Sequence, residues 1–170
     1  MGRSTPAWSI LVYRIPTQPT RLRLLIWRKL QAMGALCLQD AVYLLPARPE
    51  LDENMQYIAA QIEEMGGSCY LFAASTLLPD STERLIEEFR SQADDRFDEL
   101  IQRLDRLGAS LAAADSPGAL EQVEQELKRE RIAYLRAQRL TFFGSAREAA
   151  VAARFEEIRR SIDELSRSAK

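Results

Sequence analysis

Five basic side chains gather between residues 14 and 29, on and just before a segment with helical spacing. They are Arg14, Arg21, Arg23, Arg28 and Lys29. Guanidinium groups bind oxyanions through paired hydrogen bonds, and the free N–H groups at a helix N-terminus add to such a site. Trp27, four residues after Arg23, would add a stacking surface. Arg14, Arg21 and the N-terminus of the predicted helix could converge on one anion. These residues would then form a surface that binds DNA phosphates or a tetrahedral oxyanion. The competing interpretation is that these side chains pair with acids of a later helix.

The sequence has two cysteines, Cys37 and Cys69, and no histidine. The missing histidine excludes Ser-His-Asp and Cys-His catalysis and any zinc site that contains histidine. Two thiols are too few for a disulfide framework, and we expect both to be buried structural thiols. They are nevertheless the candidates for redox chemistry. We predict no catalytic residue, no metal and no cofactor.

A formal net charge of -2 hides an uneven distribution along the chain. Residues 1–49 carry seven basic side chains and one acidic one, a balance of +6. The remaining 16 basic and 24 acidic side chains give residues 50–170 a balance of -8. A basic end favours an anionic partner, and the alternative is a well-solvated surface with uneven charge.

The elements that must position these residues follow from hydrophobic spacing and from the glycines and prolines between them. In chain order we expect a strand at 8–15, a helix at 20–33, strands at 35–39 and 41–45, a helix at 50–65 and a strand at 68–74. The order β-α-β-β-α-β is that of a split β-α-β, ferredoxin-like domain. Such a sheet places its second and fourth strands at opposite edges. A disulfide between the two cysteines is therefore not expected.

After Pro79 the composition changes to helix formers. Leucines and phenylalanines at steps of three and four predict one long helix, and Pro117 opens the next. Ser145 and Glu148 have the spacing of a capping box, and the residues from Val151 to Leu165 alternate like a coiled-coil seam. We predict an α+β chain with a ferredoxin-like domain at 1–79 and an all-helical extension, a hairpin or three-helix unit, at 80–170.

Two further features of the helical part have a functional and a structural interpretation. Asp94 and Asp98 are four residues apart and could hold a divalent metal, but interleaved arginines favour a solvated helix face. Phe142-Phe143-Gly144 interrupts the helices. We expect it to close the end of the hairpin onto the sheet domain rather than to bind a ligand.

Three runs of the N-terminal half carry a resemblance to a known family. They read Trp-Ser-Ile-Leu-Val-Tyr-Arg-Ile-Pro-Thr-Gln-Pro-Thr at 8–20, Leu-Leu-Ile-Trp-Arg-Lys-Leu-Gln-Ala-Met-Gly-Ala at 24–35 and Asp-Ala-Val-Tyr-Leu-Leu-Pro-Ala-Arg-Pro at 40–49. With the Gly-Gly pair at 66–67 and Phe-Phe-Gly followed by Arg-Glu-Ala-Ala within 142–150, they resemble the N-terminal domain of the chromate resistance protein ChrB. A more distant likeness exists to the C-terminal domain of phenylacetate-pathway repressors and to CRISPR-associated ferredoxin-like nucleases.

The resemblance implies a cytoplasmic regulator of a chromate-resistance operon that senses chromate and acts on DNA. It thereby implies chromate or sulfate as the ligand that the arginines would accept. Full-length members of the family carry a second, C-terminal domain that lies outside these 170 residues. The nuclease relatives place an aspartate after the first strand, where this chain has Arg14. That departure argues against metal-dependent cleavage of a phosphodiester.

We therefore predict a non-enzymatic regulatory or sensor module in the cytoplasm, with duplex DNA or the chromate oxyanion as its partner. The alternative is a protein–protein interaction or dimerisation module that uses the helical extension, with a homodimer as one form. A nuclease or a chromate reductase is the least favoured class, because neither a histidine nor a flavin-binding signature is present. No membrane partner is expected, because no apolar run has the length of a transmembrane helix.

Overall fold

The computed structural model describes residues 7–16, 20–114 and 116–168. The chain divides into two compact units, residues 1–88 and 89–170. The boundary between the units lies inside a long helix that begins at Pro79. The domain boundary expected from the sequence falls after residue 79, at the start of that helix. Among the described residues, no helix combines the length and the apolar character needed to cross a membrane.

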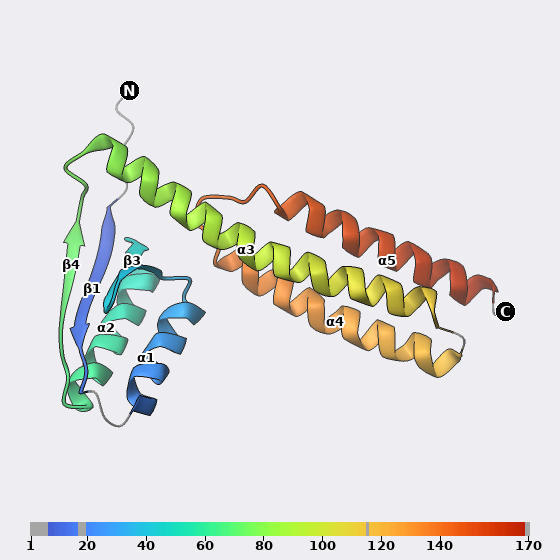
Figure 1. Ribbon diagram of the computed structural model, residues 1–170, viewed down its shortest axis with the longest axis horizontal. Helices are drawn as coiled ribbons and strands as arrows, with labels where there is room; N and C mark the ends of the chain where they lie inside the picture. Colours follow the sequence, from blue (N-terminus) through green and yellow to red (C-terminus); the bar gives the residue numbers. More distant parts are fainter. Residues whose placement is uncertain (1–6, 17–19, 115, 169–170) are drawn as a thin grey trace. The chain divides into compact units, whose positions relative to one another are not determined.

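The first unit contains a four-stranded sheet with two helices on one of its faces (Figure 1). Its elements are β1 (Trp8–Arg14), α1 (Thr20–Ala32), β2 (Leu36–Gln39), β3 (Val42–Pro46), α2 (Pro49–Glu64) and β4 (Ser68–Ala74). The strand order is β2-β3-β1-β4, and all paired neighbours are antiparallel. The expected α+β class is confirmed, and β2 and β4 lie at opposite edges as the split β-α-β order requires.

The burial of apolar side chains and the position of a helix-ending glycine explain why these segments form these elements. β1 lies between β3 and β4, and its Leu11 is completely buried. The Ser9 hydroxyl donates a hydrogen bond to Asp52 of α2, which shows that α2 covers the face of β1 that carries Ser9. Helix α1 ends where Gly34 adopts a φ of 75°, and the Gly34 N–H donates to the Gln31 carbonyl at 3.0 Å.

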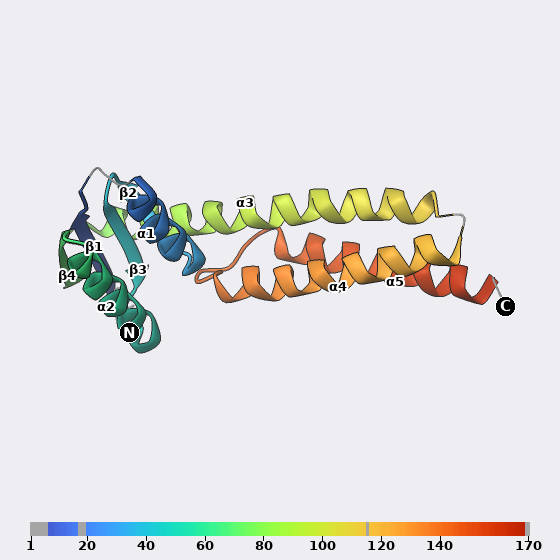
Figure 2. The same ribbon diagram turned by 90° about the horizontal axis from the view of Figure 1, so that it is seen from below.

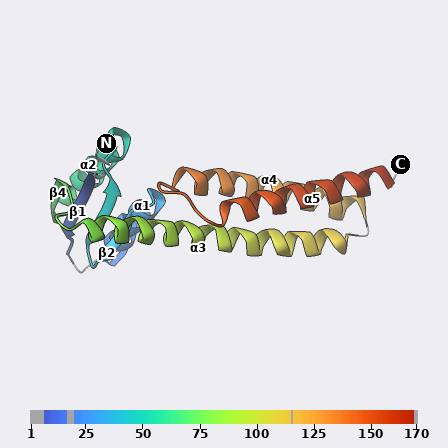
Figure 3. The same cartoon turned by 90° about the horizontal axis from the view of Figure 1, so that it is seen from above.

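The second unit is built from three helices that run side by side (Figures 2 and 3). They are α3 (Pro79–Ala112), which begins in the first unit, α4 (Pro117–Arg139) and α5 (Glu148–Ser168). Ser116 caps α4 by accepting a hydrogen bond from the Ala119 N–H at 3.3 Å, and Pro117 occupies the first turn. The expected helical extension is therefore a three-helix unit.

All three helices contribute to one core in this unit. Its buried side chains are Phe97, Leu100, Leu104, Leu107 and Leu111 of α3, Val123, Tyr134 and Ala137 of α4, and Val151, Phe155, Ile158 and Ile162 of α5. The predicted coiled-coil seam of α5 is thus buried within the chain, apart from Leu165, which is 40% exposed. Phe142 and Phe143 pack on Phe89 of α3, with ring centroids 5.8 and 5.5 Å apart.

The capping box expected at Ser145 and Glu148 is wrong. Helix α5 begins at Glu148, and the Ser145 hydroxyl donates instead to the Asp94 carboxylate of α3. Asp94 also accepts the Ala146 N–H at 3.1 Å. The Ser145 hydroxyl also accepts the Arg147 N–H at 3.0 Å, just before α5. The Glu148 carboxylate accepts from Gln138 of α4 at 2.6 Å.

Candidate functional site

A pocket of about 520 Å³ lies in the first unit, where the last residues of β1 meet α1 and the β2–β3 turn. Its lining includes Arg14 at the end of β1, and Arg23 and Trp27, four residues apart on α1. Cys37 of β2 and Tyr43 of β3 line it as well. Three strands and one helix therefore bring two guanidinium groups, an indole and a thiol to one cavity.

The two phenols of this pocket form a connected pair. The rings of Tyr13 and Tyr43 are stacked with centroids 6.1 Å apart. Burial raises the pKa of Tyr13, against the opposing effects of its hydrogen bond with Tyr43 and of the Arg23 charge. Burial also raises the pKa of Tyr43, and its hydrogen bond with Cys37 acts in the same direction. Both hydroxyls therefore stay protonated at neutral pH.

The β2–β3 turn closes one side of the pocket with Asp40 and Ala41. Ala41 has a φ of 61°, in the left-handed region that favours glycine. Its carbonyl accepts a hydrogen bond from the Tyr13 N–H at 3.0 Å, which ties the turn to β1. Asp40 supplies the one carboxylate among the described residues of the lining, so the two arginines give these residues a net positive charge.

The structure brings together some of the sequence-predicted residues and separates others. Arg14 and Arg23 share the pocket with Trp27 and Cys37. Arg21 and Arg28 are exposed on α1 and do not belong to its lining. Lys29 hydrogen-bonds to Gln61 of α2, and its Nζ lies 5.3 Å from the centroid of the Tyr57 ring. The predicted convergence of Arg14 with the N-terminus of α1 involves residues 17–19, which lie outside the described residues.

The expectation that both cysteines are buried is wrong. Cys37 is exposed, and its thiol donates to the Gln39 carbonyl at 3.4 Å. It lies on β2, an edge strand whose pairing with β3 is irregular, and only Leu36 of this strand is buried. Cys69 is partly buried and donates to the Ala59 carbonyl of α2 at 3.4 Å. Both are free thiols, as the strand order predicts.

Burial gives Cys69 a less reactive environment than its position on an edge strand would suggest. The pKa of its thiol is raised, first by burial and then by the carboxylate of Glu63. A raised thiol pKa lowers the fraction of thiolate, which is the nucleophilic form. Cys37, in the pocket with the arginines, is therefore the stronger candidate of the two for chemistry with an anion.

The acids of the long helix contact other parts of the helical unit. Besides Asp94, Asp98 forms an ion pair with Arg147, with 3.1 Å between the carboxylate oxygen and Nε. Among the described residues, no group of three or more Cys, Asp or Glu side chains could hold a metal ion. The metal interpretation of this helix thus has no support from the described part of the chain.

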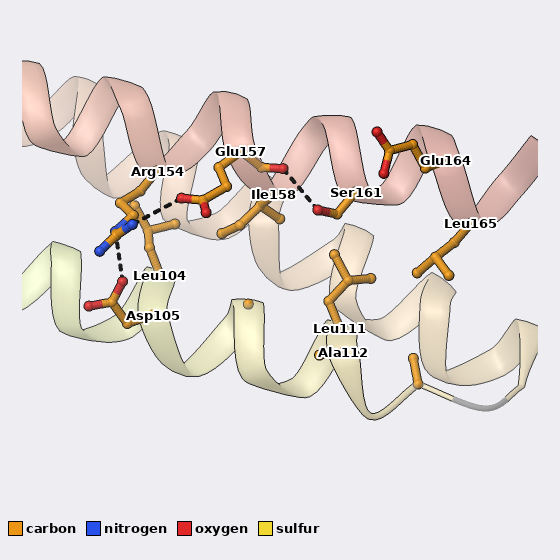
Figure 4. A pocket seen from close by; sticks show the side chains of 12 residues that line it. Leu104, Asp105, Leu111, Ala112, Arg154, Glu157, Ile158, Ser161, Glu164 and Leu165 are labelled. Atoms are coloured by element: carbon orange, nitrogen blue, oxygen red, sulfur yellow. Dashed lines mark hydrogen bonds and ion pairs between the residues drawn. The ribbon is translucent and has the colours of Figure 1, made fainter.

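A second concavity, of about 620 Å³, lies in the helical unit between α3 and α5 (Figure 4). Its floor is apolar, with Leu104 and Leu111 on α3 and Ile158 on α5. Arg154 bridges Asp105 and Glu157, at 2.9 Å in each case, at one end of this groove. Because this ion pair is exposed, it contributes little to stability.

Sequence reasoning missed Tyr13, Tyr43 and Ala41 as parts of the first pocket. Tyr13 and Tyr43 each occupy a strand position that faces the helices, and the antiparallel register of β1 with β3 brings them together. A comparison of side-chain alternation in the two predicted strands would have placed both phenols on the helix-covered face. Nothing in the local sequence indicates the positive φ of Ala41.

Comparison with known proteins identifies a family. The chain matches the family model described as "Protein ChrB, N-terminal" over residues 23–169. It is also 34% identical over 67 residues to Protein ChrB of Cupriavidus metallidurans, an alignment that covers 39% of this chain and 21% of that protein. The aligned part is thus about a fifth of the length of this curated relative. Because the family model extends over most of the chain, this protein belongs to the ChrB N-terminal family.

Proposed function

We propose that this chain is a non-enzymatic sensor module of a chromate-resistance system in the cytoplasm, and that it binds the chromate oxyanion in the pocket beside Arg14 and Arg23. One observation carries the proposal: two guanidinium groups, two protonated phenols and an exposed thiol line the same cavity. Each of these five groups can donate a hydrogen bond to an oxyanion. Family membership supports the link to chromate resistance.

Chromate and sulfate have the same shape and charge, so arginines alone would not separate them. The Cys37 thiol supplies a difference in chemistry. A thiol condenses with hydrogen chromate: a sulfur–chromium bond forms, one chromium–oxygen bond breaks, and the departing oxygen leaves as water with the thiol proton. No electron is transferred in this step, and sulfate does not undergo it. In this proposal the arginines hold the anion and Cys37 selects chromate.

A thermal-shift titration tests the binding site. Chromate at about 100 times its Kd should stabilise the folded chain by about 2.7 kcal/mol. Arg14→Ala or Arg23→Ala should abolish the rise in Tm, and Arg14→Lys should retain part of it, because lysine keeps the charge but not the paired donors. Arg28→Ala is the matched control: this side chain is exposed on α1 outside the lining and should leave the rise unchanged.

The thiol is tested separately with the same titration in chromate and in sulfate. Cys37→Ser should reduce the response to chromate to that seen with sulfate, while Cys69→Ser should leave the difference between the two anions in place. A chromate response that survives Arg14→Ala would refute the site. A preference for chromate that survives Cys37→Ser would refute the role of the thiol.

A second candidate function is regulation through binding of duplex DNA to the basic surface of α1. The observation that favours it is the exposure of Arg21 and Arg28, seven residues apart on one face of that helix. The logarithm of the binding constant should then fall with the logarithm of the salt concentration, with a slope of about -0.9 for each phosphate contacted. Binding that does not change between low and moderate salt would exclude this function.

A further inference from the structure

In the described part of the chain, strand β4 leaves one edge of the sheet open. It is the end strand of the order β2-β3-β1-β4 and pairs with β1 along all seven of its residues, Ser68–Ala74. The other edge strand, β2, has four residues and an irregular pairing. β4 contains no charged residue and no proline, and its pairing with β1 is regular. Proteins use charges, prolines and bulges to prevent pairing at an edge, and β4 has none of them.

Two aromatic side chains of β4 are exposed on one face. Tyr70 is 66% and Phe72 is 51% exposed, and their rings are stacked with centroids 6.2 Å apart. The neighbouring residue Cys69 contacts α2, so the alternation along the strand directs Tyr70 and Phe72 to the face that α2 does not cover. An uncharged open edge with a pair of exposed rings is typical of a surface that receives another strand.

We propose that β4 pairs with β4 of a second copy of this chain, antiparallel and about a two-fold axis at Leu71. The sequence of the strand is self-complementary in this register. Tyr70 lies opposite Phe72 of the second copy, Cys69 opposite Ala73, and Ser68 opposite Ala74. The two stacked pairs would then form one cluster of four rings, and cross-strand aromatic pairs stabilise antiparallel sheets.

The self-complementary sequence of β4 favours a second copy of this chain, rather than a strand of another protein, as the partner at this edge. A two-fold interface places the same patch on both sides, so the residue opposite each position must come from this same strand. In this register every opposed pair is aromatic with aromatic, apolar with apolar, or small with small, and no like charges meet. The result would be one continuous sheet of eight strands. None of the described pocket residues that the proposed function uses lies on β4, so this inference is independent of chromate binding.

Light scattering on the full chain, with paired charge variants, tests the interface. The wild type should have twice the mass of one 19.3 kDa chain. Tyr70→Lys combined with Phe72→Lys places lysine opposite lysine and should give the monomer. Tyr70→Lys combined with Phe72→Glu places lysine opposite glutamate at both positions and should restore the dimer. Because Tyr70 and Phe72 are exposed, both double variants should retain the far-ultraviolet circular dichroism of the wild type.

Leu77→Lys is the control for general loss of exposed apolar surface. Leu77 is 96% exposed and lies beyond the end of β4, so its substitution should leave the dimer intact. A monomeric wild type would overturn the proposal. So would a folded double-lysine variant that stays dimeric, or a variant with Tyr70→Lys and Phe72→Glu that does not recover the dimer. These readouts are masses, and failure of the chromate titration would not change any of them.

Discussion

At the scale of single residues, Ala41 shows that the candidate pocket carries local strain. Alanine in the left-handed region costs about 1–2 kcal/mol relative to its ordinary conformations. Ala41 adopts a φ of 61° there, in the two-residue connection between β2 and β3, and its carbonyl pairs with the N–H of Tyr13. The hydrogen bond to β1 and the pairing of the two strands must therefore hold the turn in place.

Ala41→Gly should relieve this strain. We expect a gain of up to about 1 kcal/mol in the free energy of unfolding, because the loss of steric strain exceeds the added entropy of glycine in the unfolded chain. Ala41→Val should lose about 1–3 kcal/mol, because a β-branched residue tolerates positive φ poorly. Urea unfolding measures both. A glycine variant that is less stable than the wild type would show that the turn is not strained.

Residue types indicated part of this pocket. The spacing of Arg23 and Trp27 placed them on one helical face, and the strand before α1 placed Arg14 near its start. The apolar neighbours of Cys37 suggested burial, although the expected strand order already placed β2 at an edge of the sheet. The structure adds that β2 is short and irregularly paired, which leaves Cys37 exposed. Tyr13 and Tyr43 meet only through the register of two strands that are distant in sequence.

At the scale of elements, two glycines illustrate opposite reasons for the same residue type. A Cβ on Gly67, at the α2–β4 connection, would lie 2.6 Å from the Arg14 carbonyl and 2.9 Å from that of Ile62. Both neighbours are backbone atoms and cannot rotate away. A Cβ on Gly108, inside α3, would meet no heavy atom within 4 Å. The first glycine allows β4 to approach the end of β1, while the second has no such role in the monomer.

Replacement by alanine should therefore shift stability in opposite directions. Gly67→Ala should lose about 1–3 kcal/mol through overpacking, and it should weaken anion binding because it displaces the backbone of Arg14. Gly108→Ala, the matched control, should gain up to about 1 kcal/mol from helix propensity. Thermal melts followed by circular dichroism give both values. Equal effects of the two substitutions would contradict this account of the α2–β4 connection.

The types and the order of the elements were predictable because glycines and prolines mark where helices end and begin. Gly34 and the Gly66-Gly67 pair end the first two helices, and Pro117 opens α4. The start of α5 was not predictable, since Ser145 bonds with Asp94, 51 residues earlier in the chain. A capping pattern in the sequence predicts the first residue of a helix only when the capping side chain has no stronger hydrogen-bond partner elsewhere in the fold.

At the scale of the whole molecule, each compact unit has its own core. The buried cluster of the helical unit contains residues from Phe97 to Ile162 and none from the sheet. In the first unit, buried side chains such as Leu11 and Ile62 come from the strands and from α2. Separate cores mean that a cavity in one unit removes contacts from that unit alone. The two units should therefore differ in their response to a core substitution.

The two tryptophans make this separation measurable. Trp8 and Trp27 both lie in the first unit, so tryptophan fluorescence reports its unfolding, whereas α4 and α5 contribute helical circular dichroism from the second unit alone. Leu104→Ala, at a completely buried position of α3, should cost the helical unit about 2–5 kcal/mol. In a urea titration it should lower the midpoint of the circular dichroism transition and leave the fluorescence midpoint in place. Leu11→Ala in β1 should lower the fluorescence midpoint, together with only the part of the circular dichroism signal that comes from α1, α2 and the start of α3. Equal shifts of both midpoints in either variant would show that the chain unfolds as one cooperative body, coupled through the continuous helix α3.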